Sequence, residues 1–189
     1  RGLGDVYKRQ FQDPMMGTAP TMQIEENLAL AARRGQPRGL KWGITALERA
    51  DYRELLKTLD LGLEDRLTAK VGLLSGGQRQ ALTLLMASLK QPKLLLLDEH
   101  TAALDPKTAD KVLALSDQIV QENNLTTLMI THNMKDAIAH GNRLIMMDAG
   151  RVVVDISGED KKKLTVPDLL ALFSRASGSD EANDKMLLS

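Results

Sequence analysis

Two adjacent carboxylates, Asp98 and Glu99, directly follow the most apolar stretch of the chain, the sequence LLLL at residues 94–97. Carboxylates placed there suit a hard cation such as Mg²⁺ and its bound waters, and a second carboxylate can orient an attacking water. In phosphoryl transfer, most of the protein's work is positioning and charge neutralisation. The alternative is that the pair is only the polar end of a strand, since an acid after a strand is a short and common pattern.

A second candidate is the segment LSGGQRQ at residues 74–80. Ser75 is a good helix N-cap, and Gly76 and Gly77 would let a ligand approach the backbone closely. A helix N-terminus presents N–H groups and a partial positive charge, which suits a phosphate. The alternative is an ordinary capped helix, although two glycines in a first turn cost about 1 kcal/mol each relative to alanine. We therefore expect a phosphate-binding helix end.

Three further polar residues are weaker candidates when each is taken alone. His132 follows the apolar run LTTLMIT and could hydrogen-bond a phosphate oxygen, but a single histidine is more often structural. Gln12, in FQDP, is an amide that could ligate a cation or hold a water. His100 adjoins Glu99, but successive side chains of a strand point to opposite faces, so a metal triad of residues 98–100 is not expected.

Composition limits the classes of protein that these residues can serve. The 189 residues are 43% hydrophobic and 26% charged, as in an ordinary globular domain, and the formal net charge is zero. That balance gives no electrostatic argument for a nucleic-acid partner. The absence of cysteine excludes disulfides and thiolate metal sites. No apolar run approaches the ~18 residues of a membrane span, so a membrane role is expected to come through a partner.

The elements that must position these residues fall into two parts. Residues 14–73 predict an all-helical part without strands, with one helix capped by Thr21 and another over residues 45–62. On the second helix, the residues expected to face inward are Leu47, Leu55, Leu56 and Leu59.

The second part alternates helices with strands. The expected elements are a helix over 75–89, a strand over 94–97, a helix over 106–122 capped by Asp105, a strand over 125–131, a helix over 134–139, a hairpin over 143–156 and a last helix capped by Thr165. The run at 94–97 is expected to be a parallel strand buried on both faces, and the run at 125–131 a second buried strand. This order predicts an α/β fold with a doubly wound, mostly parallel sheet, whose ligands bind beyond the carboxyl ends of its strands.

In their order along the chain, these segments resemble the nucleotide-binding subunit of an ABC transporter, a P-loop NTPase core with an inserted helical subdomain. LSGGQRQ is similar to the family signature, LLLLDE to the Walker B strand, TAALD to the D-loop, ITHNM to the switch histidine segment and FQDP to the Q-loop. Five motifs in order are far more specific than any one of them. The resemblance covers about residues 11–173, with a helical subdomain at about 14–73 and a catalytic core at about 74–173. Residues 174–189 are expected to form a flexible tail.

The resemblance implies a role for each matched residue. Glu99 resembles the general base that polarises the attacking water, and Asp98 the carboxylate that holds the Mg²⁺ shell. Gln12 resembles the glutamine that contacts the cation and the lytic water, and His132 the histidine that grips the γ-phosphate of ATP. Asp105 resembles the D-loop aspartate at the dimer interface. The residues that would cover ATP bound to the opposite subunit are Ser75, Gly76, Gly77 and Gln78.

The resemblance also implies partners and a location. They are a second ATPase subunit in a head-to-tail dimer, transmembrane permease subunits contacted near MMGTAP at residues 15–20, and an extracytoplasmic solute-binding protein, with no nucleic acid. The chain would lie on the cytoplasmic face of the inner membrane and would energise import of a small solute such as an amino acid. Two alternatives are an ATPase head of a chromosome or repair protein and a non-enzymatic partner that lends its signature face to a complete subunit.

Two departures from the family pattern stand out. No G-x-x-x-x-G-K-[ST] motif occurs, so the P-loop (Walker A) and the first strands of the family are missing, and the chain alone is expected neither to bind ATP tightly nor to hydrolyse it. Residues 1–10 lack the apolar strand that leads into the family's Q-loop, so they are expected to be foreign to the gene or disordered. A continuous upstream reading frame that reaches a P-loop through these residues would contradict that expectation.

Overall fold

The computed structural model describes residues 7–10, 17–36 and 43–177, which fall into two compact units, Arg1–Ile130 and Thr131–Ser189. The elements of the first unit are β1 (Tyr7–Gln10), α1 (Ile24–Ala32), α2 (Ala46–Lys57), a 3₁₀ turn (Val71–Leu73), α3 (Gly76–Ser88), β2 (Leu94–Asp98), α4 (Pro106–Glu122) and β3 (Thr127–Ile130). The three strands form one parallel sheet in the order β1-β2-β3, so β2 is central.

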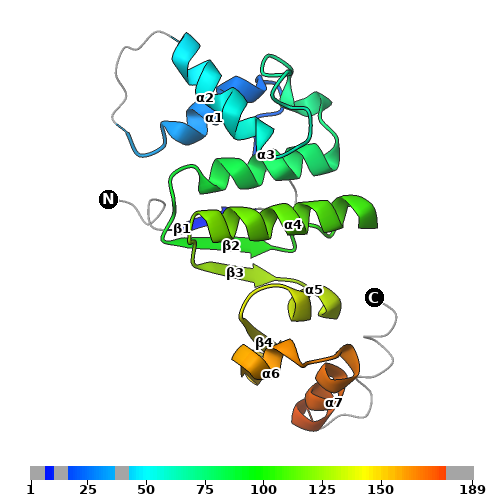
Figure 1. Ribbon diagram of the computed structural model, residues 1–189. Helices are drawn as coiled ribbons and strands as arrows, with labels where there is room; N and C mark the ends of the chain where they lie inside the picture. The colour runs from blue at the N-terminus through cyan, green and yellow to red at the C-terminus, as the bar shows by residue number, and fades with distance from the viewer. Residues whose placement is uncertain (1–6, 11–16, 37–42, 178–189) are drawn as a thin grey trace. The chain divides into compact units, whose positions relative to one another are not determined.

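Helices α3 and α4 cover one face of this sheet, and α3 lies between the sheet and the α1–α2 pair (Figure 1). Leu95 and Leu97 of β2 point into that layer and are buried, as are all residues of α3 from Gln80 to Ser88. From Gln80 onward the helix is therefore enclosed on all sides, and only its first turn reaches the surface. The position of its N-terminus is therefore fixed by the core.

The other face of the sheet is less covered than the sequence predicts. Leu128 and Ile130 of β3 are 50% and 51% exposed, and the register with β2 puts them on the face opposite Leu95 and Leu97. The prediction that this strand is buried is therefore wrong for this face in the described part of the chain. An apolar run indicates a strand, but it does not show how many layers cover it.

The first strand was not expected. Residues 7–10 pair in parallel with β2, Tyr7 opposite Leu94 and Gln10 opposite Leu97, so the expectation of disorder over residues 1–10 is wrong for these four. Residues 1–6 lie outside the described residues. A foreign origin for residues 1–10 stays a prediction.

Helix α1 begins at Ile24, and not at the predicted cap Thr21. The first N–H groups of the helix bond to distant carbonyls, Ile24 N to Ala69 O at 3.0 Å and Glu25 N to Leu67 O at 3.0 Å. A helix leaves its first N–H groups without partners inside the helix, and here a neighbouring segment of chain satisfies them. Sequence-local capping rules cannot anticipate that pairing.

Helix α2 is capped by Thr45, whose hydroxyl accepts a hydrogen bond from Glu48 N, and its inward face carries Leu56. Leu47 is 74% exposed, so its predicted inward position is wrong. It precedes Leu56 by nine residues, or two and a half turns of about 3.6 residues, and therefore lies on the opposite side of the helix. Tyr52, four residues before Leu56, is buried although it was not predicted to be.

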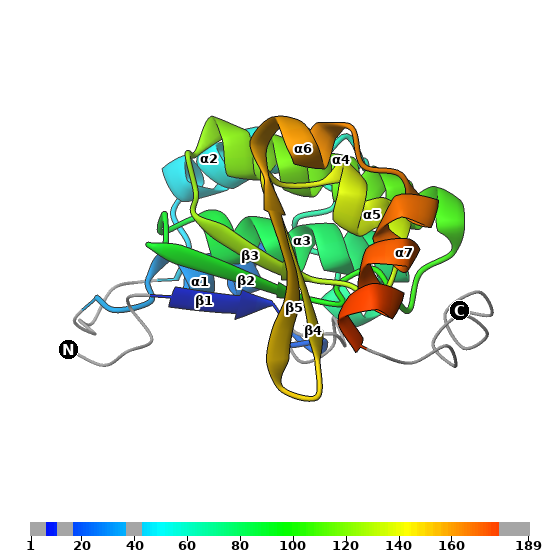
Figure 2. The same cartoon turned by 90° about the horizontal axis from the view of Figure 1, so that it is seen from below.

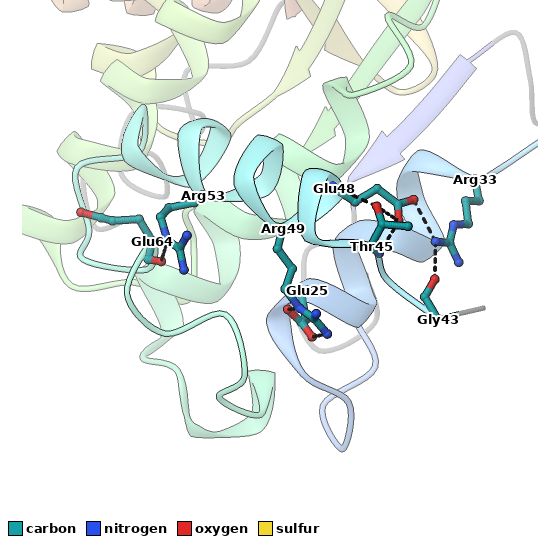
Figure 3. A network of polar contacts seen from close by, with 8 residues as sticks. All are labelled: Glu25, Arg33, Gly43, Thr45, Glu48, Arg49, Arg53 and Glu64. Atoms are coloured by element: carbon teal, nitrogen blue, oxygen red, sulfur yellow. Dashed lines mark hydrogen bonds and ion pairs between the residues drawn. The ribbon is translucent and has the colours of Figure 1, made fainter. Parts of the chain in front are cut away.

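Two ion pairs join α1 to α2 and to the turn before it (Figure 3). The Arg49 side chain donates two hydrogen bonds, of 2.8 and 3.0 Å, to the buried carboxylate of Glu25. Arg33 donates to Glu48 at 2.9 Å and to the Gly43 carbonyl at 2.8 Å. Apart from the isolated bridge between residues 23 and 70, no strand interrupts the described part of residues 14–73, in line with the prediction of a helical segment.

The second unit is a hairpin packed against helices. Its elements are α5 (Met134–Ala139), β4 (Arg143–Asp148), β5 (Arg151–Ser157), α6 (Gly158–Lys162) and α7 (Val166–Ser177). Leu144, Val154 and Leu169 form its buried centre, and Figure 2 shows α5 and α7 to one side of the hairpin. The predicted hairpin and the Thr165 cap of the last helix are confirmed.

Two features of this unit differ from expectation. Helix α7 continues to Ser177, so residues 174–177 are helical rather than part of the predicted tail, and residues 178–189 lie outside the described ranges. The unpredicted helix α6 carries Lys161, whose buried ammonium donates to the carbonyls of Ile138, His140 and Gly141. A lysine at the C-terminus of α5 satisfies carbonyls that the helix leaves unbonded.

None of the helices in the described ranges is both long and apolar enough to cross a lipid bilayer.

We expect Glu25→Gln to lower the free energy of unfolding by about 1.5 kcal/mol, because it removes charge-assisted hydrogen bonds from a buried carboxylate. Urea denaturation of the chain measures the change. Glu54→Gln is the matched control, since its ion pair with Lys57 is exposed and such pairs contribute less than about 1 kcal/mol. Equal losses in the two variants would contradict the assignment of stability to the buried pair.

The pKa of Glu48 is lowered from 4.5 to about 2 by hydrogen bonds from the Thr45 backbone and then from Arg33. Because the folded pKa lies below the unfolded value, this contribution is complete above the unfolded pKa and is lost as the pH falls toward the folded one. We expect Glu48→Gln to be less stable than the wild type by under about 1 kcal/mol near neutral pH, because the pair is partly exposed. Urea denaturation at decreasing pH should show that difference closing in acid, and a difference that widens would contradict it.

Candidate functional site

The two carboxylates lie at the carboxyl end of the central strand, as the sequence predicts. Asp98 is the last residue of β2 and pairs in register with Ile130, the last residue of β3. Both Asp98 and Glu99 are partly exposed, in contrast to the buried Leu97 before them. The apolar strand thus carries the acids from the core to the edge of the sheet where parallel α/β folds bind their ligands.

Glu99 has a left-handed backbone conformation, with φ of +44°. Its N–H donates to the carbonyl of Ile130 at 2.9 Å, and its own carbonyl accepts from Ala102 N at 3.1 Å. Left-handed backbone is strained for any residue other than glycine and persists only where the surroundings enforce it. The strand therefore ends in a sharp and specific turn at the residue that resembles the general base.

The LSGGQ segment forms the start of α3. The Ser75 hydroxyl accepts from Gln78 N at 3.3 Å, and the Gln78 side chain accepts from Ser75 N at 3.2 Å and donates to the Leu61 carbonyl at 3.2 Å. The predicted N-cap is confirmed, and the reciprocal bonds make it a capping box. Gln78 in addition ties the start of this helix to the helical segment.

The two glycines of this segment differ in their surroundings. A Cβ atom at Gly77 would lie 2.2 Å from Thr108 Cγ2, a separation that real side chains do not adopt. A Cβ atom at Gly76 would lie 3.2 Å from Cδ2 of Leu104, the end of a flexible side chain. Gly76 is exposed, whereas Gly77 is buried, so Gly77 is required for packing whether or not a ligand approaches it.

Asp105 connects this packing to the segment that resembles the D-loop. Its carboxylate caps α4 by accepting from Thr108 N at 3.1 Å, and its pKa is lowered by hydrogen bonds from the Thr108 side chain and then from its backbone. The same Thr108 places its methyl group against Gly77. The structure therefore brings two predicted site segments together within one unit. Asp105 was predicted, but Thr108 was missed, although its place three residues after a cap was a usable signal.

Two predicted site residues lie outside the described part of the first unit. His132 is exposed and belongs to the second unit, where Asn133 caps α5 by accepting from Lys135 N at 2.9 Å. It follows Ile130, the partner of Asp98, by two residues. Gln12 lies outside the described residues.

The acidic residues fit a magnesium ion only as part of its ligand set. Within the described ranges, no three His, Cys, Asp or Glu side chains are grouped so that they could hold a metal. Mg²⁺ usually takes one or two carboxylates and completes its shell with phosphates and water. Asp98, beside Glu99 at the strand end, matches that pattern. His100, the residue after the pair, is buried and bonds to Ser116 of α4.

Comparison with known proteins identifies the family. The sequence profile described as "ABC transporter" matches residues 7–102. A tyrosine transport ATP-binding protein of Clostridioides difficile (strain R20291) is 49% identical over 171 residues, which cover 90% of this chain and 68% of that protein. The phosphonates import ATP-binding protein PhnC of Frankia casuarinae is 33% identical over 141 residues, 74% of this chain and 55% of that protein.

A solved structure agrees with the fold. The dimeric post-hydrolysis state of the ATP-binding cassette MJ0796, bound to ADP and Pi, matches with a TM-score of 0.63 and 29% identity over 81% of this chain and 63% of that chain. The predicted α/β class with an ABC-type core is thereby confirmed. The chain spans about two thirds of the tyrosine transport protein and about half of PhnC. The profile match and the identity over 171 residues show that the chain belongs to the ABC transporter family and, within it, to the ATP-binding subunits.

Proposed function

We propose that the protein is the ATP-hydrolysing subunit of a membrane importer of a small solute. The observation that carries this proposal is the carboxylate pair at the end of the central parallel strand, with Glu99 turned out of the strand by its left-handed backbone. Family membership supports it, as do relatives named as transport and import ATP-binding proteins.

In this proposal the residues divide the work of phosphoryl transfer. Glu99 would accept a proton from the attacking water, and Asp98 would hold a magnesium ion through its bound water. A bound magnesium ion would neutralise charge on the phosphates. His132 would hydrogen-bond the γ-phosphate, and Gln12 would contact the cation and the lytic water. These roles follow the family pattern.

The start of α3 is proposed to face a second subunit. Ser75, Gly76 and Gln78 are exposed or partly exposed at a capped helix N-terminus, where backbone N–H groups and the helix dipole favour a phosphate. The similar cassette MJ0796 was solved as a dimer bound to ADP and Pi. We infer a head-to-tail pair in which this segment covers ATP held by the partner, with Asp105 near the interface.

The solute and the remaining partners are also proposals. The relative that is 49% identical is named for tyrosine transport, which favours an amino acid over the phosphonates of the more distant relative. An importer would also require permease subunits, contacted near MMGTAP, and an extracytoplasmic solute-binding protein. The protein would then act at the cytoplasmic face of the inner membrane.

A second candidate is a non-enzymatic partner that lends its signature face to a complete subunit. Mixing the chain with a nucleotide-competent subunit and measuring ATP-dependent association tests the signature face. ATP turnover by the purified chain alone would contradict the need for a partner. A chromosome or repair role is disfavoured, since such heads carry long coiled coils and the longest described helix, α4, has 17 residues.

We expect Glu99→Gln in the full-length protein to lower kcat for ATP at least about 100-fold, because loss of a general base costs that much or more. ATP-dependent association should persist, since glutamine keeps the size and hydrogen-bonding capacity of the side chain. Phosphate release and light scattering measure the two properties. Glu54→Gln, on an exposed face of α2, is the control and should turn over like the wild type. Retained turnover in Glu99→Gln would refute the assignment of Glu99 as the base.

We expect Gly77→Ala to destabilise the protein by about 1 kcal/mol, the difference between overpacking against Thr108 and the gain in helix propensity. Thr108→Ser in the same protein should restore stability, because serine keeps the hydroxyl that bonds Asp105 and loses the methyl group. Thermal unfolding of the single and double variants measures this coupling.

Gly76→Ala separates packing from ligand approach. Its Cβ atom would meet only the flexible end of Leu104, so the variant should fold normally. If ATP from the partner subunit approaches this backbone, Gly76→Ala should weaken ATP-dependent association with stability unchanged.

For the pair Gly77 and Thr108, a double variant Gly77→Ala with Thr108→Ser that is no more stable than Gly77→Ala alone would show that the contact with Thr108 is not the constraint.

A further inference from the structure

The residue that follows Glu99 is a buried histidine. His100 is 3% exposed, and its Nε2 atom lies 3.0 Å from the hydroxyl of Ser116, which is itself 4% exposed in the middle of α4. A polar ring buried this completely needs a hydrogen-bond partner, and the partner found belongs to a different element. The turn after β2 is thus attached to α4 by a side chain.

The direction of this hydrogen bond can be assigned. The Ser116 hydroxyl donates its hydrogen to the Val112 carbonyl at 2.7 Å. A hydroxyl has one hydrogen to give, so towards His100 it can only accept. The hydrogen between the two side chains therefore belongs to Nε2 of the ring. The result is a chain of bonds from His100 through Ser116 to the backbone of α4.

The hydrogen bond between His100 and Ser116 lies next to Glu99, the residue with the left-handed backbone. Side chains alternate along a strand, so a straight continuation of β2 would put Glu99 on the same face as Leu95 and Leu97, toward the apolar core. The left-handed backbone of Glu99 interrupts that alternation. Such a conformation persists only where the surrounding structure enforces it. Asp98 is held by its strand, and His100 is held by α4.

We propose that His100 is a positioning residue for Glu99, and that its buried hydrogen bond to Ser116 holds the turn that presents the Glu99 carboxylate at the end of β2. The inference rests on the proposed role of Glu99 in ATP hydrolysis. His100 itself touches no reacting atom in this account. It acts by fixing the backbone from which the carboxylate projects.

The test uses four variants of the full-length protein, one of them held as a replacement. His100→Leu fills the space without an N–H donor, and His100→Gln keeps an amide N–H close to the place of Nε2. Ile119→Val, a buried change in the same helix one turn after Ser116, is the matched control for lost packing in α4. Ser116→Ala removes the acceptor from the other side and replaces His100→Leu if that variant does not fold.

Two readouts are needed, one for hydrolysis and one for the backbone. We expect His100→Leu to lower kcat about tenfold with an unchanged KM for ATP, since small misplacements of a reacting group cost that much or more. His100→Gln should recover most of the loss. Amide hydrogen exchange should become faster at Glu99 and Ala102, whose N–H groups bond to the carbonyls of Ile130 and Glu99, in His100→Leu but not in Ile119→Val.

Each outcome decides the inference. If His100→Leu matches Ile119→Val in kcat and in the exchange of the Glu99 amide, His100 only fills the core and the proposal is overturned. If the exchange changes and kcat does not, the hydrogen bond to Ser116 holds the turn but does not position the carboxylate for the reaction, and the proposal is also overturned. Failure of the proposed function looks different, because Glu99→Gln would then hydrolyse ATP as the wild type does.

Discussion

The alternation of side chains along β2 is the constraint on which the candidate site depends. Burial of Leu95 and Leu97 under α3 and α4 fixes which positions of the strand face the core. The same alternation would direct Glu99 inward, where an ionised carboxylate without partners is very costly. The left-handed turn at Glu99 interrupts the alternation, so the carboxylate need not point into the core. One strand therefore both buries the apolar run in the core and places the two acids at the edge of the sheet.

The position of α3, the helix that carries the LSGGQ segment, is constrained by its burial in the core. Since α3 is buried on nearly all sides, its N-terminus cannot shift without disturbing the core. Gly77 then brings that N-terminus into contact with the first turn of α4, where Thr108 completes the cap made by Asp105. Helix α4 also carries Ser116, the partner of His100. Helix α4 thus contacts both the LSGGQ segment and the turn at Glu99. Its packing in the core fixes the distance between the two.

What the sequence could predict depended on how local each interaction is. Asp105 and Thr165 were identified as caps because a cap acts within three residues, and Asp98 was placed correctly because a strand end follows from an apolar run. Thr21 is not the cap because Gln23 takes that place in a capping box with Glu26, and the next N–H groups of α1 bond to residues more than forty positions away. The turn at Glu99 was missed for the same reason, since it depends on a side chain of α4. The exposure of Leu128 depends on how many layers cover the sheet, which no strand pattern encodes.

Hydrogen bonds also link the loop that carries GTAP, residues 17–20, to the segment that precedes LSGGQ. The Asn27 side chain bonds both the N–H and the carbonyl of Ala19, at 2.8 and 3.1 Å, and so holds the loop to α1. The Pro20 carbonyl accepts from Gly72 N at 2.8 Å, and Gly72 lies three residues before Ser75. Two of these bonds are made by the Asn27 side chain and one by the backbone of Gly72, so a displacement of the loop must either break them or move the segment before α3. If the loop contacts a permease, as proposed, these hydrogen bonds connect that contact to the segment that leads into α3.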